Sequence, residues 1–114
     1  MIPAEAARDT AKLLADTAEN MPVRQLTYEL RRRAREWARA VDELDMAGDD
    51  GVIELVGTVG GGMYALGNMD SAEPWLPIVR AFPSNGGWSL HLDDMGRSVY
   101  RNLAGPTSPV VVKR

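Results

Sequence analysis

One long apolar stripe in the first half of the chain constrains the fold more than any other feature of the sequence. Apolar side chains recur there at spacings of three and four residues, which predicts one long amphipathic helix. The stripe comprises Val23, Leu26, Leu30, Ala34, Trp37, Val41 and Leu44. Because an α-helix rises by about 1.5 Å per residue, a helix over residues 22–44 would be roughly 34 Å long. That length is enough to cross one face of a small sheet.

A shorter helix is predicted before this one, over residues 3–20. Pro3 suits a first helical turn, and Glu5 lies near the positive end of the helix dipole. Its apolar side chains are mostly small, so the helix requires a neighbour to pack against. Pro22 disfavours helical geometry at the residue before it and begins the second helix. The sequence therefore predicts a helical hairpin over residues 3–44.

The remainder, residues 51–114, has the composition of a β-sheet. Residues 52–56 and 63–66 are predicted to form a hairpin around three consecutive glycines at 60–62. Residues 76–82 and 88–92 are predicted to form a second hairpin. In its returning strand Trp88, Leu90 and Leu92 alternate onto one face.

Two later segments complete the predicted sheet. Residues 97–103 fit either a strand or a short helix, since Asp93 or Asp94 suits a helix cap while Met95-Gly96 suits a turn. We favour the strand. Residues 110–112 are three valines and predict a strand near a sheet edge, because a proline precedes them.

Together these elements predict one α+β domain over residues 1–114. A two-helix hairpin is expected to pack on one face of a mostly antiparallel sheet of four to six strands. The order of the strands does not follow from the sequence. With 45% hydrophobic and 25% charged residues, the chain has the composition of an ordinary globular protein.

Charge and residue usage exclude several functions. The chain has no cysteine, which removes disulfides and thiolate chemistry and fits a reducing compartment. Neither a signal-peptide pattern nor a membrane-spanning apolar run occurs, so we expect a cytoplasmic protein that does not bind membranes. A net charge of −3 argues against coating nucleic acid with the whole surface but allows a local basic patch.

No motif for catalysis, metal binding or a cofactor is complete. The glycines at 60–62 lack the lysine and the following helix of a phosphate-binding loop. A calcium loop starting at Asp45 would require a glycine where Asp50 stands. His91 is the only histidine, and neither a Gly-x-Ser-x-Gly elbow nor a His-Glu-x-x-His helix accompanies it to complete a triad or a zinc site. We therefore expect no enzyme, no metal and no cofactor.

Arginines on the polar face of the second helix are the strongest candidates for a binding site. These are Arg31, Arg32, Arg35 and Arg39. Arginine binds carboxylates and phosphates through two parallel hydrogen bonds and is enriched at interface hot spots. Glu29 stands four residues before Arg33 and predicts a helical ion pair. Trp75, between Pro74 and Leu76, is predicted either to anchor a partner or to fold back on the core.

Three functions remain open on this basis. The first is a small interaction protein that binds an acidic partner protein, such as an inhibitor, an immunity protein, a phage or bacterial accessory protein or an assembly adaptor. The second is a nucleic-acid-binding regulator that uses the same arginines, although Tyr28 is the one nearby ring off the apolar stripe. The third, ranked lowest, is a small-ligand binder or enzyme. Homo-oligomers are compatible with all three.

Overall fold

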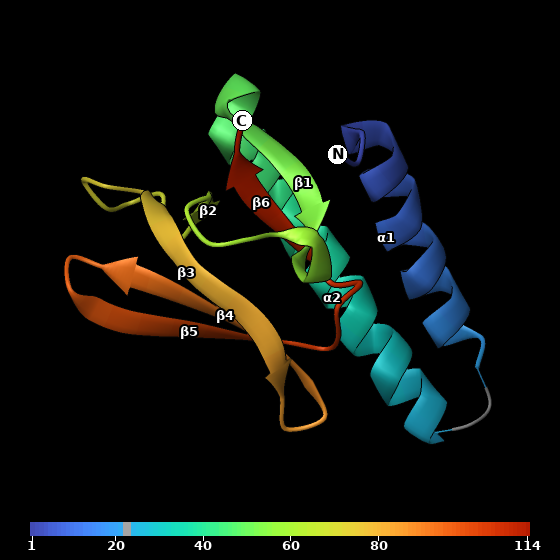
Figure 1. Ribbon diagram of the computed structural model, residues 1–114. Coiled ribbons are helices and arrows are strands. Elements are labelled where there is room, and N and C mark those ends of the chain that lie inside the picture. The colour runs from blue at the N-terminus through green and yellow to red at the C-terminus, as the bar shows by residue number, and fades with distance from the viewer. Residues whose placement is uncertain (22–23) are drawn as a thin grey trace.

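The computed structural model describes residues 1–21 and 24–114 and confirms the α+β fold (Figure 1). Its helices are α1 (Ala4–Glu19) and α2 (Arg24–Ala47). Its strands are β1 (Gly51–Leu55), β2 (Tyr64–Leu66), β3 (Trp75–Ser84), β4 (Gly87–Asp94), β5 (Arg97–Leu103) and β6 (Pro109–Lys113). Single turns of 3-10 helix, Gly48–Asp50 and Val56–Thr58, flank β1. The predicted helix start at Pro22 and the stripe position Val23 lie outside the described residues, as does the side chain of Leu26.

The two helices lie side by side, as predicted (Figure 1). Ala7 and Ala18 of α1 are buried, while Leu13 remains 67% exposed. α2 runs three residues beyond the predicted end at Leu44 and stops at Ala47. Gly48 ends it with a φ of 63°, a left-handed conformation that glycine adopts without steric cost.

The sheet has six strands in the order β1-β6-β2-β3-β4-β5, and each neighbouring pair is antiparallel. The predicted hairpin between residues 52–56 and 63–66 is wrong, because β6 lies between β1 and β2 and pairs with both. Val110, Val111 and Val112 of β6 are all buried. A continuous run of buried β-branched residues is typical of a strand that is covered on both faces. β6 accordingly lies one strand in from the edge.

The second predicted hairpin is confirmed as β3 and β4. Residues 97–103 form a strand and not a helix, because Met95 and Gly96 make a tight turn that returns the chain beside β4. The Asp93 carboxylate accepts a hydrogen bond of 2.8 Å from the backbone N–H of Gly96, which stabilises this turn.

The sheet is curved and has a hydrophobic core on each face. The inner core lies among the strands, and the other lies between the sheet and the helices. The inner core comprises Val56, Val59, Ala65, Leu76, Ile78, Leu90, Leu92, Leu103, Val110 and Val112. The helix-side core comprises Ala7, Ala40, Ile53, Leu66 and Val111, with Trp37 and Trp75 packed against it. β3 has a register shift between Ile78 and Arg80, the kind of irregularity at which a strand bends.

Candidate functional site: an arginine groove between α2 and β5

The apolar stripe of α2 determines which of its arginines face outward. Ala34 and Ala40 are buried, and Trp37 packs against the helix-side core. Since residues three and four apart share one helix face, this orientation leaves Arg35 and Arg39 exposed on the other side. α2 lies against β1 and β6, while β3, β4 and β5 extend away from α1 (Figure 1).

Three of the four predicted arginines line one groove with residues of β5. The arginine groove, as we call it, has a volume of about 200 Å³. Its lining residues are Arg32, Arg35, Glu36, Arg39, Arg101, Asn102 and Leu103. The three β5 residues of the groove are the last three of that strand, so the groove lies between α2 and the C-terminal end of β5. A second hollow of about 230 Å³ shares Arg32, Asn102 and Leu103 and extends the groove toward the β3–β4 turn.

A buried ion pair between Glu43 of α2 and Arg101 of β5 lies beside this groove. Arg101 Nη2 lies 3.0 Å from Glu43 Oε1, and the side chains are only 14% and 10% exposed. The more exposed Arg39 donates to the same carboxylate oxygen at 2.9 Å. Burial lowers the pKa of the Arg101 guanidinium below its ordinary value, and the Glu43 carboxylate opposes that shift. The buried Nε of Arg101 has no hydrogen-bond partner within the described part of the chain.

The arginines of the groove outnumber the carboxylates beside them, Glu36 and Glu43. Among the described residues, no carboxylate forms an ion pair with Arg31, Arg32 or Arg35. Glu36 also lines the groove, but in the described part of the chain it forms hydrogen bonds and no ion pair. Its carboxylate accepts hydrogen bonds from the Ala104 N–H at 2.9 Å and from the Ser108 hydroxyl at 2.8 Å. The groove is therefore suited to bind an anionic group from outside.

Glu36 also holds the loop between β5 and β6 against α2. We expect Glu36→Ala to lower the free energy of unfolding by about 1–3 kcal/mol, because the fully buried Ser108 hydroxyl and the Ala104 N–H would both lose their acceptor. Urea denaturation measures the change. Glu29→Ala, an exposed carboxylate on the same helix, serves as the control and should leave stability nearly unchanged. Equal effects of the two substitutions would contradict the tethering role.

The predicted ion pair between Glu29 and Arg33 does not form. Arg33 Nη1 instead donates a hydrogen bond of 2.8 Å to Thr107 Oγ1, in the same loop that Glu36 holds. A short intrahelical pair on an exposed surface contributes only about 0.2–0.5 kcal/mol, so a tertiary contact readily replaces it.

Arg31 lies in a different hollow from the arginine groove. This open depression on the outer face of α2, the Tyr28 hollow, is lined by Arg24, Thr27, Tyr28, Arg31 and Arg35. Tyr28 is 62% exposed there. Arg35 borders both hollows, so the four predicted arginines form two adjoining sites.

Trp75 folds back on the core, which is the second of the two positions predicted for it. It is the first residue of β3 and packs, half-buried, against the helix-side core. Its ring lies near Gly51, where a Cβ would come within 2.9 Å of the Ala47 Cβ and 3.0 Å of Val111 Cγ1, so these two side chains restrict that position to glycine. Trp75 lines neither the arginine groove nor the Tyr28 hollow.

The other polar candidates have partners within the fold. His91 stacks on Tyr100 with ring centroids 4.5 Å apart, and its Nε2 lies 2.9 Å from Ser98 Oγ. Among the acidic residues between positions 42 and 54, Asp45 pairs with Arg8 and Glu54 pairs with the terminal amino group. The described residues contain no group of three acidic or histidine side chains that would hold a metal ion.

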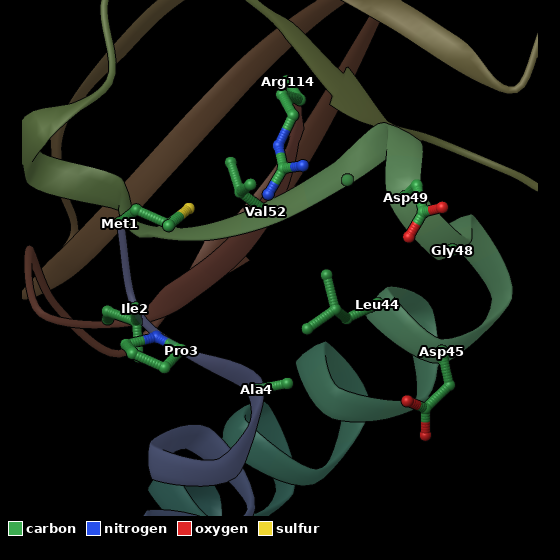
Figure 2. Close-up of a pocket in the computed structure, with 11 residues that line it drawn as sticks. Met1, Ile2, Pro3, Ala4, Leu44, Asp45, Gly48, Asp49, Val52 and Arg114 are labelled. Atoms are coloured by element: carbon green, nitrogen blue, oxygen red, sulfur yellow. The ribbon is translucent and has the colours of Figure 1, made fainter.

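A further pocket of about 320 Å³ lies where the chain ends meet the end of α2 (Figure 2). Met1, Leu44 and Val52 supply apolar walls, and Asp49 and Arg114 supply opposite charges. One of its carboxylates, Asp45, is already paired with Arg8. With charges of both signs in its wall, this pocket shows less preference for one ligand charge than the arginine groove does.

Sequence reasoning missed Arg101 and Glu43, although the sequence carried a signal. Val99, Arg101 and Leu103 alternate onto one face of β5, so a charged residue stands among core positions. A buried arginine requires an acidic partner, and Glu43 in α2 is that partner.

No protein-family model matches this chain, and no similar curated protein or solved structure was found. None of the described helices is long and apolar enough to cross a membrane.

Proposed function

We propose that this chain is a protein-interaction module that binds an acidic segment of another protein in the arginine groove. The observation that carries the proposal is the convergence of Arg32, Arg35 and Arg39 with Arg101 of β5 on one groove. Arg32 and Arg35 have no carboxylate partner among the described residues. The planar guanidinium binds carboxylates with two parallel hydrogen bonds, which favours acidic partners over neutral ones.

The overall charge supports an orienting role for the groove. A chain with a net charge of −3 repels an acidic partner over most of its surface, so that the basic groove selects the approach direction. This mode of action suits an inhibitor, an immunity protein, a phage or bacterial accessory protein or an assembly adaptor in the cytoplasm. None of these roles requires a catalytic group, and we propose no enzyme activity.

Nucleic-acid binding is the second candidate, and the Tyr28 hollow favours it. An exposed ring among Arg24, Arg31 and Arg35 combines a stacking surface with phosphate-binding side chains. A single ring is a small platform, since stacking sites usually use several aromatic side chains. Nucleic acid therefore ranks below an acidic protein.

The experiment that tests this proposal is affinity capture with a charge-reversed variant. Tagged wild type and Arg32→Glu/Arg35→Glu are incubated in native lysate, and retained proteins are identified by mass spectrometry. We expect the variant to lose the specific partner at least about tenfold, since two charge-assisted contacts become repulsive. The control is Lys12→Glu/Lys113→Glu, which changes the net charge equally at exposed positions outside the groove.

Each outcome is informative. A partner lost from the groove variant and kept by the control supports the proposal. Retention of nuclease-sensitive nucleic acid with a steep salt dependence would favour the second candidate. Equal retention of every partner by all three proteins would contradict both.

A further inference from the structure

The two edges of the sheet differ in how they are covered. At the β1 edge, the backbone N–H of Ile2 donates a hydrogen bond of 2.9 Å to the carbonyl of Ile53 and forms a short bridge there. At the β5 edge, no backbone group from outside the sheet bonds to residues 97–103 in the described part of the chain. An uncovered edge strand presents unpaired N–H and C=O groups and is a template for another strand.

The turn between β4 and β5 determines which backbone groups of β5 point outward. Met95 and Gly96 have φ values of 53° and 88°, as a two-residue hairpin turn of type I′ requires. The pair that closes such a turn, Asp94 and Arg97, is hydrogen-bonded, and the pairs alternate from there. Ser98, Tyr100 and Asn102 therefore direct their N–H and C=O groups away from β4.

The outward edge of β5 and the arginine groove are continuous. Asn102 lines the groove and is one of the three residues with outward backbone groups. Arg101, next to it, lies on the face of β5 that contacts α2 through Glu43. A strand added beside β5 would place every second side chain on this face, toward the arginines of α2.

We propose that the partner segment binds in extended form as a seventh strand on β5, with alternate acidic side chains directed at Arg32, Arg35 and Arg39. This inference rests on the proposed function and specifies how the acidic segment is recognised. Main-chain hydrogen bonds to Tyr100 and Asn102 supply affinity, and the arginines supply specificity, as in other cases of strand addition. A second copy of this chain is a poorer occupant, since pairing of two β5 strands would bring two arginine grooves together.

The test uses a fluorescein-labelled eight-residue peptide of alternating glutamate and threonine, followed by fluorescence anisotropy. Tyr100→Pro removes an outward N–H without removing a ladder hydrogen bond, and Tyr100→Ala is its matched control because both lose the ring. We expect Tyr100→Pro to bind about tenfold more weakly than Tyr100→Ala, which corresponds to the loss of one hydrogen bond. Thermal unfolding checks that both variants fold.

Two peptide controls keep the inference testable even if Tyr100→Pro fails to fold. A peptide of equal charge, with its glutamates in one block, should bind wild type more weakly than the alternating peptide. The alternating peptide with N-methylated backbone amides should lose binding. Hydrogen exchange at Ser98, Tyr100 and Asn102 of the wild type should slow when the unmodified peptide is bound.

Several results would overturn the inference. These are equal binding of the methylated peptide, unchanged hydrogen exchange at the β5 edge, and no binding of the alternating peptide to wild type. A concentration-dependent dimer that protects the same amides without peptide would identify a second copy as the occupant. If the groove variant still loses its captured partner while the edge results are negative, the arginine function stands and only the strand mode fails.

Discussion

Replacement of Glu43 by alanine is expected to lower the free energy of unfolding by about 3–5 kcal/mol. Glu43 is buried and accepts hydrogen bonds from both Arg39 and Arg101. Without it, the Arg101 guanidinium stays buried and loses its ion-pair partner, and burial already disfavours its charged form. Urea denaturation followed by circular dichroism measures the loss.

A double variant separates the cost of an unpaired charge from the loss of packing. Glu43→Ala/Arg101→Met places an apolar side chain where the guanidinium lies, and buried pairs replaced by apolar residues are often neutral in stability. The double variant should therefore be more stable than Glu43→Ala alone. If Glu43→Ala lowered the free energy of unfolding by less than about 1 kcal/mol, the Arg101 guanidinium would have to donate its hydrogen bonds to water or to another acceptor.

Replacement of Leu90 by alanine is expected to lower the free energy of unfolding by about 2–5 kcal/mol. Leu90 is fully buried in the inner core, on the strand between β3 and β5. The smaller side chain would leave a cavity between strands that the curled sheet holds in place. Chemical denaturation gives the change in free energy, and its unchanged slope would show that the folded state remains compact.

Leu90→Met is the control, because it retains most of the side-chain volume and should cost less than about 1.5 kcal/mol. Similar losses for the two variants would show that shape, and not the buried volume, dominates at this position. Losses that are small for both would contradict the placement of Leu90 in the inner core.

The helices and most strands follow from local pattern, whereas the pairing of β1 does not. The spacing of Leu30, Ala34, Trp37 and Val41 determines one face of α2, and that face packs in the structure as the period predicts. The β1–β2 hairpin was predicted from proximity in sequence. Both strands instead pair with β6, which is distant in sequence. The three buried valines of β6 require cover on both faces, and a local pattern does not show what supplies it.

Only part of the candidate site was predicted, again because a local pattern does not determine how the strands are arranged. Helix periodicity identified the arginines of α2, since that property is local. It did not identify Arg101 or the free edge of β5, which depend on how the strands are arranged. Nor did it show that the Glu36 carboxylate accepts hydrogen bonds from the loop between β5 and β6.

Tethers on both sides of the groove keep it in a fixed shape. Glu43 joins α2 to β5, and Glu36 and Arg33 join α2 to the loop that follows. A site whose side chains are already positioned loses less conformational entropy when a partner binds. The stability of the fold and the geometry of the groove thus depend on the same carboxylates.

The most direct test of the arginine groove is an NMR titration of ¹⁵N-labelled protein with the alternating glutamate–threonine peptide, read at the arginine Nε–Hε signals. We predict that the signals of Arg32, Arg35 and Arg39 shift together and saturate with one affinity, while those of Arg8, Arg80 and Arg114 stay unchanged. Equal shifts at all arginines, or shifts confined to those outside the groove, would contradict the account.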